Sequence, residues 1–361
     1  MKPHRTIARG VALIAVCLTI LGCKPPTVMD KTGSDVVVLH LASIDSLDPT
    51  GQLVAPGAFV EAVKRLSGGR IQVAVERDHG AGSAGAETDI VRAIAAGELD
   101  GGWPSTRAFS RAGFRGLEPV EAPFTLTSYA AEKALVTGPE GQSLLATLSG
   151  SGVVGLGLAV GPLRRPWAAD RPLVEPRAWR GVHFRSYNSP VQDDDIRSLG
   201  GVPFQAGWQL GSLLRSGRLR GLDLEVIAIL RNRYGRLLPA GVDNVVMWPR
   251  ILVLALSAKR FDSLTPQQQA WVRAAADQAV QASVRFAYEE DRYARELCSQ
   301  GVRFAEATPA QLTALRRAGR PVVQHLMQDP ATASSMLAVQ SVANRFPDTD
   351  VLDVPASCRS R

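Results

Sequence analysis

One arginine stands where a predicted strand ends, in the stretch RGVHFRSYNSP, residues 180–190. Val182 and Phe184 alternate with His183 and Arg185, which is the pattern of a strand with one buried face. A solvated surface arginine, alone or paired with a nearby acid, fits this pattern, and so does a binding site. The planar guanidinium fork matches a carboxylate, and ligands of open α/β sheets lie beyond the carboxyl ends of strands. Arg185 is therefore a candidate residue of a binding site.

The other residue types that could do chemistry form no recognisable catalytic or metal-binding motif. Neither G-x-S-x-G nor H-E-x-x-H occurs. The segment GLGLAVGP, residues 155–162, lacks the spacing and the following helix of a nucleotide-binding loop. No metal spacing connects the histidines, which are His4, His40, His79, His183 and His325. A dispersed catalytic triad stays open, because catalytic groups meet in space. We expect a protein without enzymatic activity, metal or cofactor.

Composition and charge describe a folded chain long enough for two or three domains. Of its 361 residues, 45% are hydrophobic and 21% are charged. The net charge of +7 first suggests nucleic acid as a partner. The basic residues are scattered, however, and the N-terminus predicts export. These features argue against nucleic acid and favour a mildly cationic site for an anionic ligand.

The N-terminus has the pattern of a bacterial export signal. Lys2, Arg5 and Arg9 precede the apolar run Val11 to Leu21, which is too short to span a membrane as a mature helix. The ending TILGC resembles a lipobox, whose cysteine, here Cys23, becomes the lipidated N-terminus. A plain signal peptide with a chance cysteine is the alternative. We expect residues 1–23 to be a lipoprotein signal and 24–34 a polar tether.

The two remaining cysteines are candidates for a disulfide. Cys17 leaves with the signal and Cys23 carries the lipid in this interpretation, so Cys298 and Cys358 remain. Cysteines in an oxidising compartment often pair. Two free thiols are the alternative, because spacing alone does not test the geometry.

Strands and helices alternate along most of the chain, which predicts an α/β fold with a largely parallel sheet. Apolar residues with a period of two, or in buried runs, predict strands at 36–42, 71–75, 152–160, 181–186, 200–205 and 301–307. Apolar stripes predict helices at 59–66, 90–95, 209–215 and from Thr308. A single helix from Pro266 to Ser299, capped by Thr265, would be about 50 Å long and would connect two lobes.

Six segments, in this order and spacing, resemble the solute-binding proteins of TRAP transporters, the DctP family. They are LSGGRIQVAV, GAE, AAGELDGG, PVEAPFTL, RGVHFR and FDSLTPQQQ, and the resemblance covers Val36 to Val323. It implies a periplasmic-binding-protein-like fold of two α/β lobes that close around a ligand cleft and are bridged by a long helix. It also implies delivery of the ligand to an ion-driven membrane permease.

The resemblance divides the chain into the following parts. They are 35–160 with 247–285 as the first lobe, 161–246 with 286–330 as the second, and 331–361 as a C-terminal tail. It implies an extracytoplasmic, lipid-anchored monomer. A lipoprotein that hands its closed form to a membrane sensor is the alternative, and an enzyme on the same scaffold is a more remote one.

Several site residues follow from the resemblance. Arg185 ends the strand whose arginine grips the substrate carboxylate in the family. A second family arginine corresponds to Arg164 or Arg165, and we favour Arg164. Glu87 either accepts hydrogen bonds from the ligand or a water, or simply favours the N-terminus of its helix. Trp103 and Trp208 either wall the cleft or belong to the core.

One segment departs from the family pattern. Where the family has G-x-x-D-G-Q-E-N, whose amide contacts the ligand, this chain has GRLRGLDLE, residues 217–225. The acid is replaced by Arg220, and the two amides by Leu222 and Leu224. The altered set of hydrogen-bonding groups predicts a ligand other than the common dicarboxylates or sialic acid, or a changed transport role.

Overall fold

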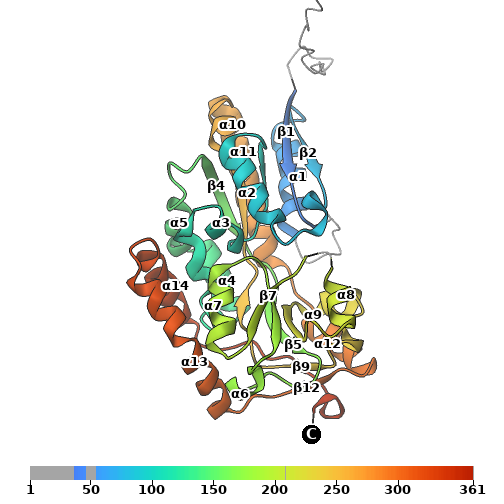
Figure 1. Cartoon of the computed structure of the whole chain (residues 1–361). Helices are drawn as coiled ribbons and strands as arrows, with labels where there is room; N and C mark the ends of the chain where they lie inside the picture. Colours follow the sequence, from blue (N-terminus) through green and yellow to red (C-terminus); the bar gives the residue numbers. More distant parts are fainter. Residues whose placement is uncertain (1–35, 46–53, 208, 361) are drawn as a thin grey trace, which may run out of the picture. The chain divides into compact units, whose positions relative to one another are not determined.

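The computed structural model describes residues 36–45, 54–207 and 209–360. The strands and helices belong to one compact unit, Val37–Arg361. The signal peptide, the tether, Cys23 and Trp208 lie outside the described residues. The predicted α/β architecture with two sheets is confirmed, and both sheets can be followed in Figure 1.

The first sheet has five strands in the order β2-β1-β3-β11-β4. Their bounds are Val37–Ala42 (β1), Ile71–Glu76 (β2), Gly101–Gly102 (β3), Val153–Ala159 (β4) and Leu252–Ser257 (β11). Helix α1 (Val54–Leu66) packs against α11 (Pro266–Arg285). Phe59 of α1 and Ala279 of α11 are buried in the core of this sheet, which forms because both helices present an apolar face.

The second sheet has the order β12-β9-β5-β8-β6-β7, and β10 pairs with β5. Its strands are Leu163–Ala168 (β5), His183–Ser186 (β6), Val202–Gln205 (β7), Gly221–Leu224 (β8), Ala240–Val242 (β9), Trp248–Pro249 (β10) and Arg303–Ala305 (β12). Phe184 of β6 and Trp167 of β5 are fully buried. Each sheet therefore has a core of its own.

The prediction of a largely parallel sheet is confirmed, because all strands but one run in the same direction in each sheet. Strands β1, β2 and β3 pair in parallel, whereas β11 runs antiparallel to β3 and β4. In the second sheet β5 runs antiparallel to β8, β9 and β10. The chain passes from the first sheet to the second between β4 and β5, and it returns to the first sheet between β10 and β11. These two connections therefore run in opposite directions.

The predicted single helix from Pro266 to Ser299 is wrong. The structure has α11 (Pro266–Arg285) and α12 (Glu290–Ser299), and the backbone at Phe286 is extended. The Tyr288 ring stacks on Tyr129, with centroids 4.8 Å apart, and its hydroxyl donates to the Val160 carbonyl at 3.0 Å. Tyr288 makes these contacts from the non-helical segment between α11 and α12. The predicted start is confirmed, since Thr265 caps α11.

The other helices of the described residues pack around the two sheets. They are Ala86–Ala96 (α2), Arg107–Arg111 (α3), Tyr129–Thr137 (α4), Pro139–Ala146 (α5), Pro176–Trp179 (α6), Pro190–Ser198 (α7), Leu210–Arg215 (α8), Val226–Arg231 (α9), Ala258–Asp262 (α10), Pro309–Gln328 (α13) and Ala333–Arg345 (α14). Short 3₁₀ turns occur at His79–Gly82, Arg115–Glu121, Tyr234–Arg236 and Ala356–Cys358. Helix α14 buries Val339 and Val342 in the first core, and Figure 1 shows the C-terminus beside β12.

Cys298 of α12 and Cys358 near the C-terminus come together at disulfide geometry, with their Cα atoms 5.5 Å apart. The bond itself stays a prediction for the mature protein. If it forms, the Cys298→Ala/Cys358→Ala variant should lose about 2–4 kcal/mol of unfolding free energy, because the unfolded chain is no longer crosslinked. Urea unfolding measures this loss. Two free thiols in denatured, unreduced protein that begins at residue 24 would contradict the prediction.

Candidate functional site

Arg185 lies in β6, on the side of the strand opposite the buried ring of Phe184. Its Nε donates to the Ala206 carbonyl at 2.9 Å, and its Nη1 donates to the Tyr187 hydroxyl. The guanidinium carbon lies 3.6 Å from the centroid of the Tyr187 ring. Within the described residues Arg185 has no carboxylate partner, and burial lowers the pKa of its guanidinium. This arginine is thus a cation held by a backbone carbonyl and a phenol.

Arg164 and Arg165 are neighbours in β5 and therefore point to opposite faces of the sheet. Arg164 approaches Arg185: its Nη1 donates to the Tyr187 hydroxyl at 3.1 Å and lies 2.9 Å from Glu225 Oε2. Burial alone would lower the pKa of Arg164, but the Glu225 carboxylate raises it.

Arg165 belongs to a different environment. It donates to the backbone carbonyls of Asp243 and Asp350, at 2.7 and 3.0 Å, and lies 3.3 Å from the Glu290 carboxylate. Of the two candidates, only Arg164 is brought together with Arg185. Arg165 instead ties β5 to α12 and to the C-terminal segment.

Glu87, in the first turn of α2, is 8% exposed and takes part in an ion pair. Arg107 donates through Nε to Glu87 Oε2 at 2.7 Å, and the Ser105 hydroxyl donates to Oε1 at 2.7 Å. Burial would raise the pKa of this carboxyl, but Arg107 and Arg250, helped by Ser105, lower it to about 2. Glu87 reaches the site through Arg107, whose guanidinium carbon lies 4.0 Å from the Tyr187 ring centroid.

Trp103 does not join this group. Trp103 is 4% exposed and packs edge-to-face on Phe59, with ring centroids 6.3 Å apart. Trp103 belongs to the core of the first sheet, which was the alternative to a place in the wall of the cleft. Trp208 lies outside the described residues, so its predicted role stays a prediction.

Sequence reasoning missed several members of the site. Arg250 lies 2.6 Å from Asp45 and 3.6 Å from Glu87, and it comes from the segment between β10 and β11. Tyr187 carries the phenol that Arg107, Arg164 and Arg185 surround. We use the term arginine cluster for the guanidinium groups of Arg107, Arg164, Arg185 and Arg250.

The altered segment GLDLE contributes acids to this site. Leu222 and Leu224 of β8 are buried in the second core, so Asp223 points to the opposite face. Asp223 Oδ2 accepts a hydrogen bond from Trp248 Nε1 at 3.0 Å, and Glu225 pairs with Arg164. Burial raises the pKa of Asp223 against the opposing effect of Arg164. The alternation of Leu and acid in GLDLE was the signal that could have revealed both residues.

Glu121 is a further buried acid near the cluster. It is 3% exposed, and its Oε2 accepts a hydrogen bond from the Ser189 hydroxyl at 2.8 Å. Burial raises the pKa of Glu121 to about 8, with Arg107 as the main opposing charge. At neutral pH this carboxyl is therefore mostly protonated.

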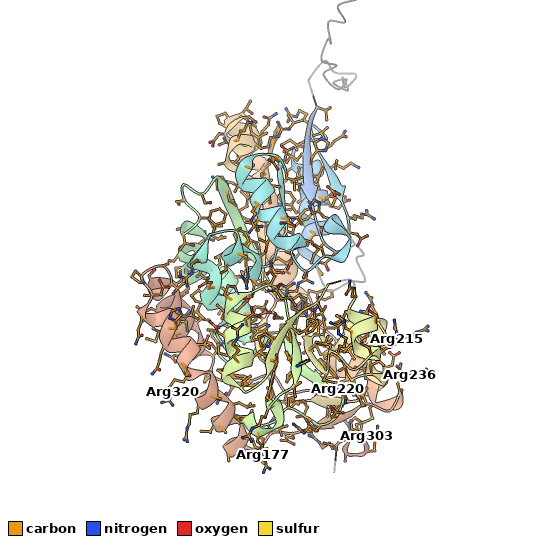
Figure 2. All side chains as sticks on the ribbon, viewed as in Figure 1. Arg177, Arg215, Arg220, Arg236, Arg303 and Arg320 are labelled. Atoms are coloured by element: carbon orange, nitrogen blue, oxygen red, sulfur yellow. A yellow bond between two sulfur atoms is a disulfide. The ribbon has the colours of Figure 1, made fainter. Side chains whose placement is uncertain are left out.

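The net positive charge elsewhere is spread over the surface. Figure 2 shows the labelled side chains Arg177, Arg215, Arg220, Arg236, Arg303 and Arg320 on separate segments of the chain. In the part of the chain that the structure describes, no group of three or more acids, histidines or cysteines could hold a metal ion. No helix within the same residues has both the length and the apolarity to cross a membrane.

Comparisons with known proteins agree with this fold. The model of the family "Bacterial extracellular solute-binding protein, family 7" (DctP) matches residues 45–329. A curated solute-binding protein of Verminephrobacter eiseniae is 24% identical over 198 residues, which are 53% of this chain and 56% of the relative. The match therefore spans little more than half of that relative.

Solved structures of TRAP periplasmic solute-binding proteins have the same fold. One from Sulfitobacter sp. NAS-14.1, with bound β-D-galacturonate, has a TM-score of 0.75, 22% identity, and covers 84% of this chain and 99% of its own. One from Shewanella oneidensis with bound succinate has a TM-score of 0.74, 18% identity, and 85% and 99% coverage. The galactonate complex of the sugar acid binding protein from Advenella mimigardefordensis has a TM-score of 0.73, 19% identity, and 86% and 99% coverage.

The family model, in agreement with two sheets that have separate cores and a half-buried arginine near a strand end, places the chain in the class of solute-binding proteins. The chain belongs to family 7 of the bacterial extracellular solute-binding proteins, the DctP family. The resemblance drawn from the six sequence segments is confirmed.

Proposed function

We propose that this protein captures a small organic anion through its carboxylate and delivers it to a TRAP-type permease. The observation that carries the proposal is Arg185, a half-buried guanidinium that forms no ion pair with a carboxylate among the described residues. A ligand carboxylate would supply the missing charge and accept two parallel hydrogen bonds. Relatives of this fold bind galacturonate, galactonate and succinate, all of which carry carboxylates.

The ligand in this proposal lies between two lobes that close over it. The first lobe holds residues 35–160 and 247–285, and the second holds 161–246 and 286–330. Asp45, Glu87 and Arg107 reach the arginine cluster from the first-lobe segments, and Arg164 and Arg185 from the second. A site built from both lobes couples ligand binding to their closure.

A panel of organic acids tests the proposed function. Thermal-shift screening of the native chain that begins at residue 24, followed by isothermal titration calorimetry, should give at least one acid that binds. Native mass spectrometry of freshly purified protein should show whether a ligand co-purifies. If no acid raises the unfolding temperature and none co-purifies, the proposed function is wrong.

We also propose that the protein is exported and held to a membrane by a lipid on Cys23. The support is the basic, apolar and Gly-Cys sequence of residues 1–23, together with the membership in an extracellular family. Cys23→Ala should release the protein from membranes and abolish labelling with a fatty acid. Cys17→Ala is the matched control and should change neither. Continued lipid labelling of the Cys23→Ala protein would contradict the anchor.

A close contact between the two lobes provides a test of closure. Gly207 follows β7 and packs on the segment Gly82–Ala84, where a Cβ on residue 207 would lie 2.7 Å from the Ala84 nitrogen. Gly207→Ala should therefore weaken binding about 5- to 140-fold, because an extra methyl in a packed contact costs about 1–3 kcal/mol. Titration calorimetry with the best acid of the panel measures this effect. Gly57→Ala is the control, since a Cβ there has no neighbour within 4 Å, and equal affinities of the two variants would contradict the prediction.

A further inference from the structure

Three of the four guanidinium groups in the arginine cluster form an ion pair with a carboxylate of the protein. Arg107 pairs with Glu87 at 2.7 Å, Arg164 with Glu225 at 2.9 Å, and Arg250 with Asp45 at 2.6 Å. The side chains of these three arginines are at most 5% exposed. Because buried ion pairs are screened little by solvent, each of these guanidinium groups is already neutralised by the protein.

Arg185 is the one member of the cluster without such a partner among the described residues. Its Nη1 donates to the Tyr187 hydroxyl, and Arg164 Nη1 donates to the same oxygen at 3.1 Å. A phenol oxygen accepts hydrogen bonds but carries no charge at neutral pH. Asp223 is close enough to act on Arg185 electrostatically, but burial raises the pKa of Asp223, so the cluster keeps one guanidinium that no ion pair neutralises.

Further acids surround the cluster and make a second ligand charge unfavourable. Asp223 of β8 is fully buried, and Glu225, which directly follows β8, is 7% exposed and lies on the same side of the chain. Glu121 is buried near Arg107. A second ionised carboxylate on the ligand would lie among these acids with no unpaired arginine to meet it. Burial already raises the pKa of Asp223 and Glu121, so the same burial would destabilise a second ionised carboxylate placed beside them.

Resting on the function proposed above, we propose that the ligand of this protein carries a single ionised carboxylate, bound by Arg185, and is otherwise neutral. The other three arginines position Tyr187 and the surrounding acids rather than bind a second carboxylate. Hydroxyl or amide groups of the ligand can exchange hydrogen bonds with Asp223, Glu121 and Tyr187 without adding charge.

Pairs of acids that differ by one carboxylate test this inference. Titration calorimetry at pH 7.5 would compare galactonate with galactarate, succinamate with succinate, and glutaramate with glutarate. Any further acid found in the panel is compared in the same way with its diacid or its half-amide. We expect the monoacid of each binding pair to bind at least tenfold more tightly than the diacid. A diacid that binds as tightly as its monoacid counterpart overturns this inference, whereas failure of every acid overturns the proposed function and this inference with it.

Glu225→Gln provides a gain-of-function test. This change leaves Arg164 without its carboxylate, so diacids should bind at least tenfold more tightly than to the native protein, while monoacids change less. Glu306→Gln is the matched control, because Glu306 forms an exposed pair with Arg359. The thermal unfolding of both variants verifies their fold, and if Glu225→Gln does not fold, the native pairs alone decide. Diacid binding to folded Glu225→Gln protein that is no tighter than to native protein would overturn Glu225 as the excluding charge.

Discussion

Arg185→Ala should weaken binding of the best organic acid at least 30-fold. Removing one partner of a buried, hydrogen-bonded charge pair costs about 2–5 kcal/mol, and 1.4 kcal/mol is tenfold in affinity. Titration calorimetry of the native and variant proteins measures the loss. The affinity of the Arg185→Lys protein should lie between those of the native and the Arg185→Ala proteins, because an ammonium keeps the charge but lacks the planar fork.

The same variant should leave the stability of the ligand-free fold nearly unchanged. Arg185 has no carboxylate partner among the described residues, and burial already disfavours its charged form. Replacing it removes a desolvation penalty together with its hydrogen bonds to Ala206 and Tyr187. We expect an unfolding temperature no more than about 2 °C below that of the native protein.

A matched surface variant separates a site effect from a general loss of positive charge. Arg220 precedes β8 in the same sheet and pairs with the half-exposed Asp170. Arg220→Ala removes an equal charge outside the arginine cluster and should leave the affinity unchanged. If Arg185→Ala binds as tightly as Arg220→Ala, then Arg185 does not hold the carboxylate.

The sequence predicts site residues best where a local pattern marks them. Arg185 was predicted because it lies near the end of an alternating strand, a position where ligands bind in α/β folds, and its part in binding stays a prediction. Arg107 and Arg250 carry no such local signal. They reach the site from α3 and from the turn between β10 and β11, which only the assembled chain brings together.

The error in the fold, the single long helix, has a physical reason. Phe286 and Ala287 continue the apolar helical stripe, yet Tyr288 stacks on Tyr129, which is far away in sequence. In the same way, β5 and β11 run against the other strands of their sheets because the chain crosses twice between the sheets. Local periodicity predicts which segments form elements, but contacts between distant residues decide where helices break and how strands pair.

Arg164→Met should destabilise the fold, in contrast to Arg185→Ala. Arg164 is 1% exposed and lies 2.9 Å from Glu225, which is itself buried. Removing the arginine leaves an uncompensated carboxylate, which costs about 3–5 kcal/mol. The midpoint of urea unfolding at pH 8 should fall accordingly. The double variant Arg164→Met/Glu225→Leu should recover most of this loss, because an apolar pair can replace a buried ion pair.

The unfolding free energy that Arg164→Met loses should be smaller at low pH than at high pH. Burial raises the pKa of Glu225, and Arg164 is the largest effect that lowers it below its usual value in the native protein. Without Arg164 the folded-state pKa moves above the unfolded-state value, so the penalty is absent below the unfolded pKa and grows as the pH rises through that window. Arg164→Met protein should therefore be closer in stability to the native protein at pH 5 than at pH 8. An equal loss at both values, or no recovery in the double variant, would show that the volume of Arg164 rather than its charge supports the fold.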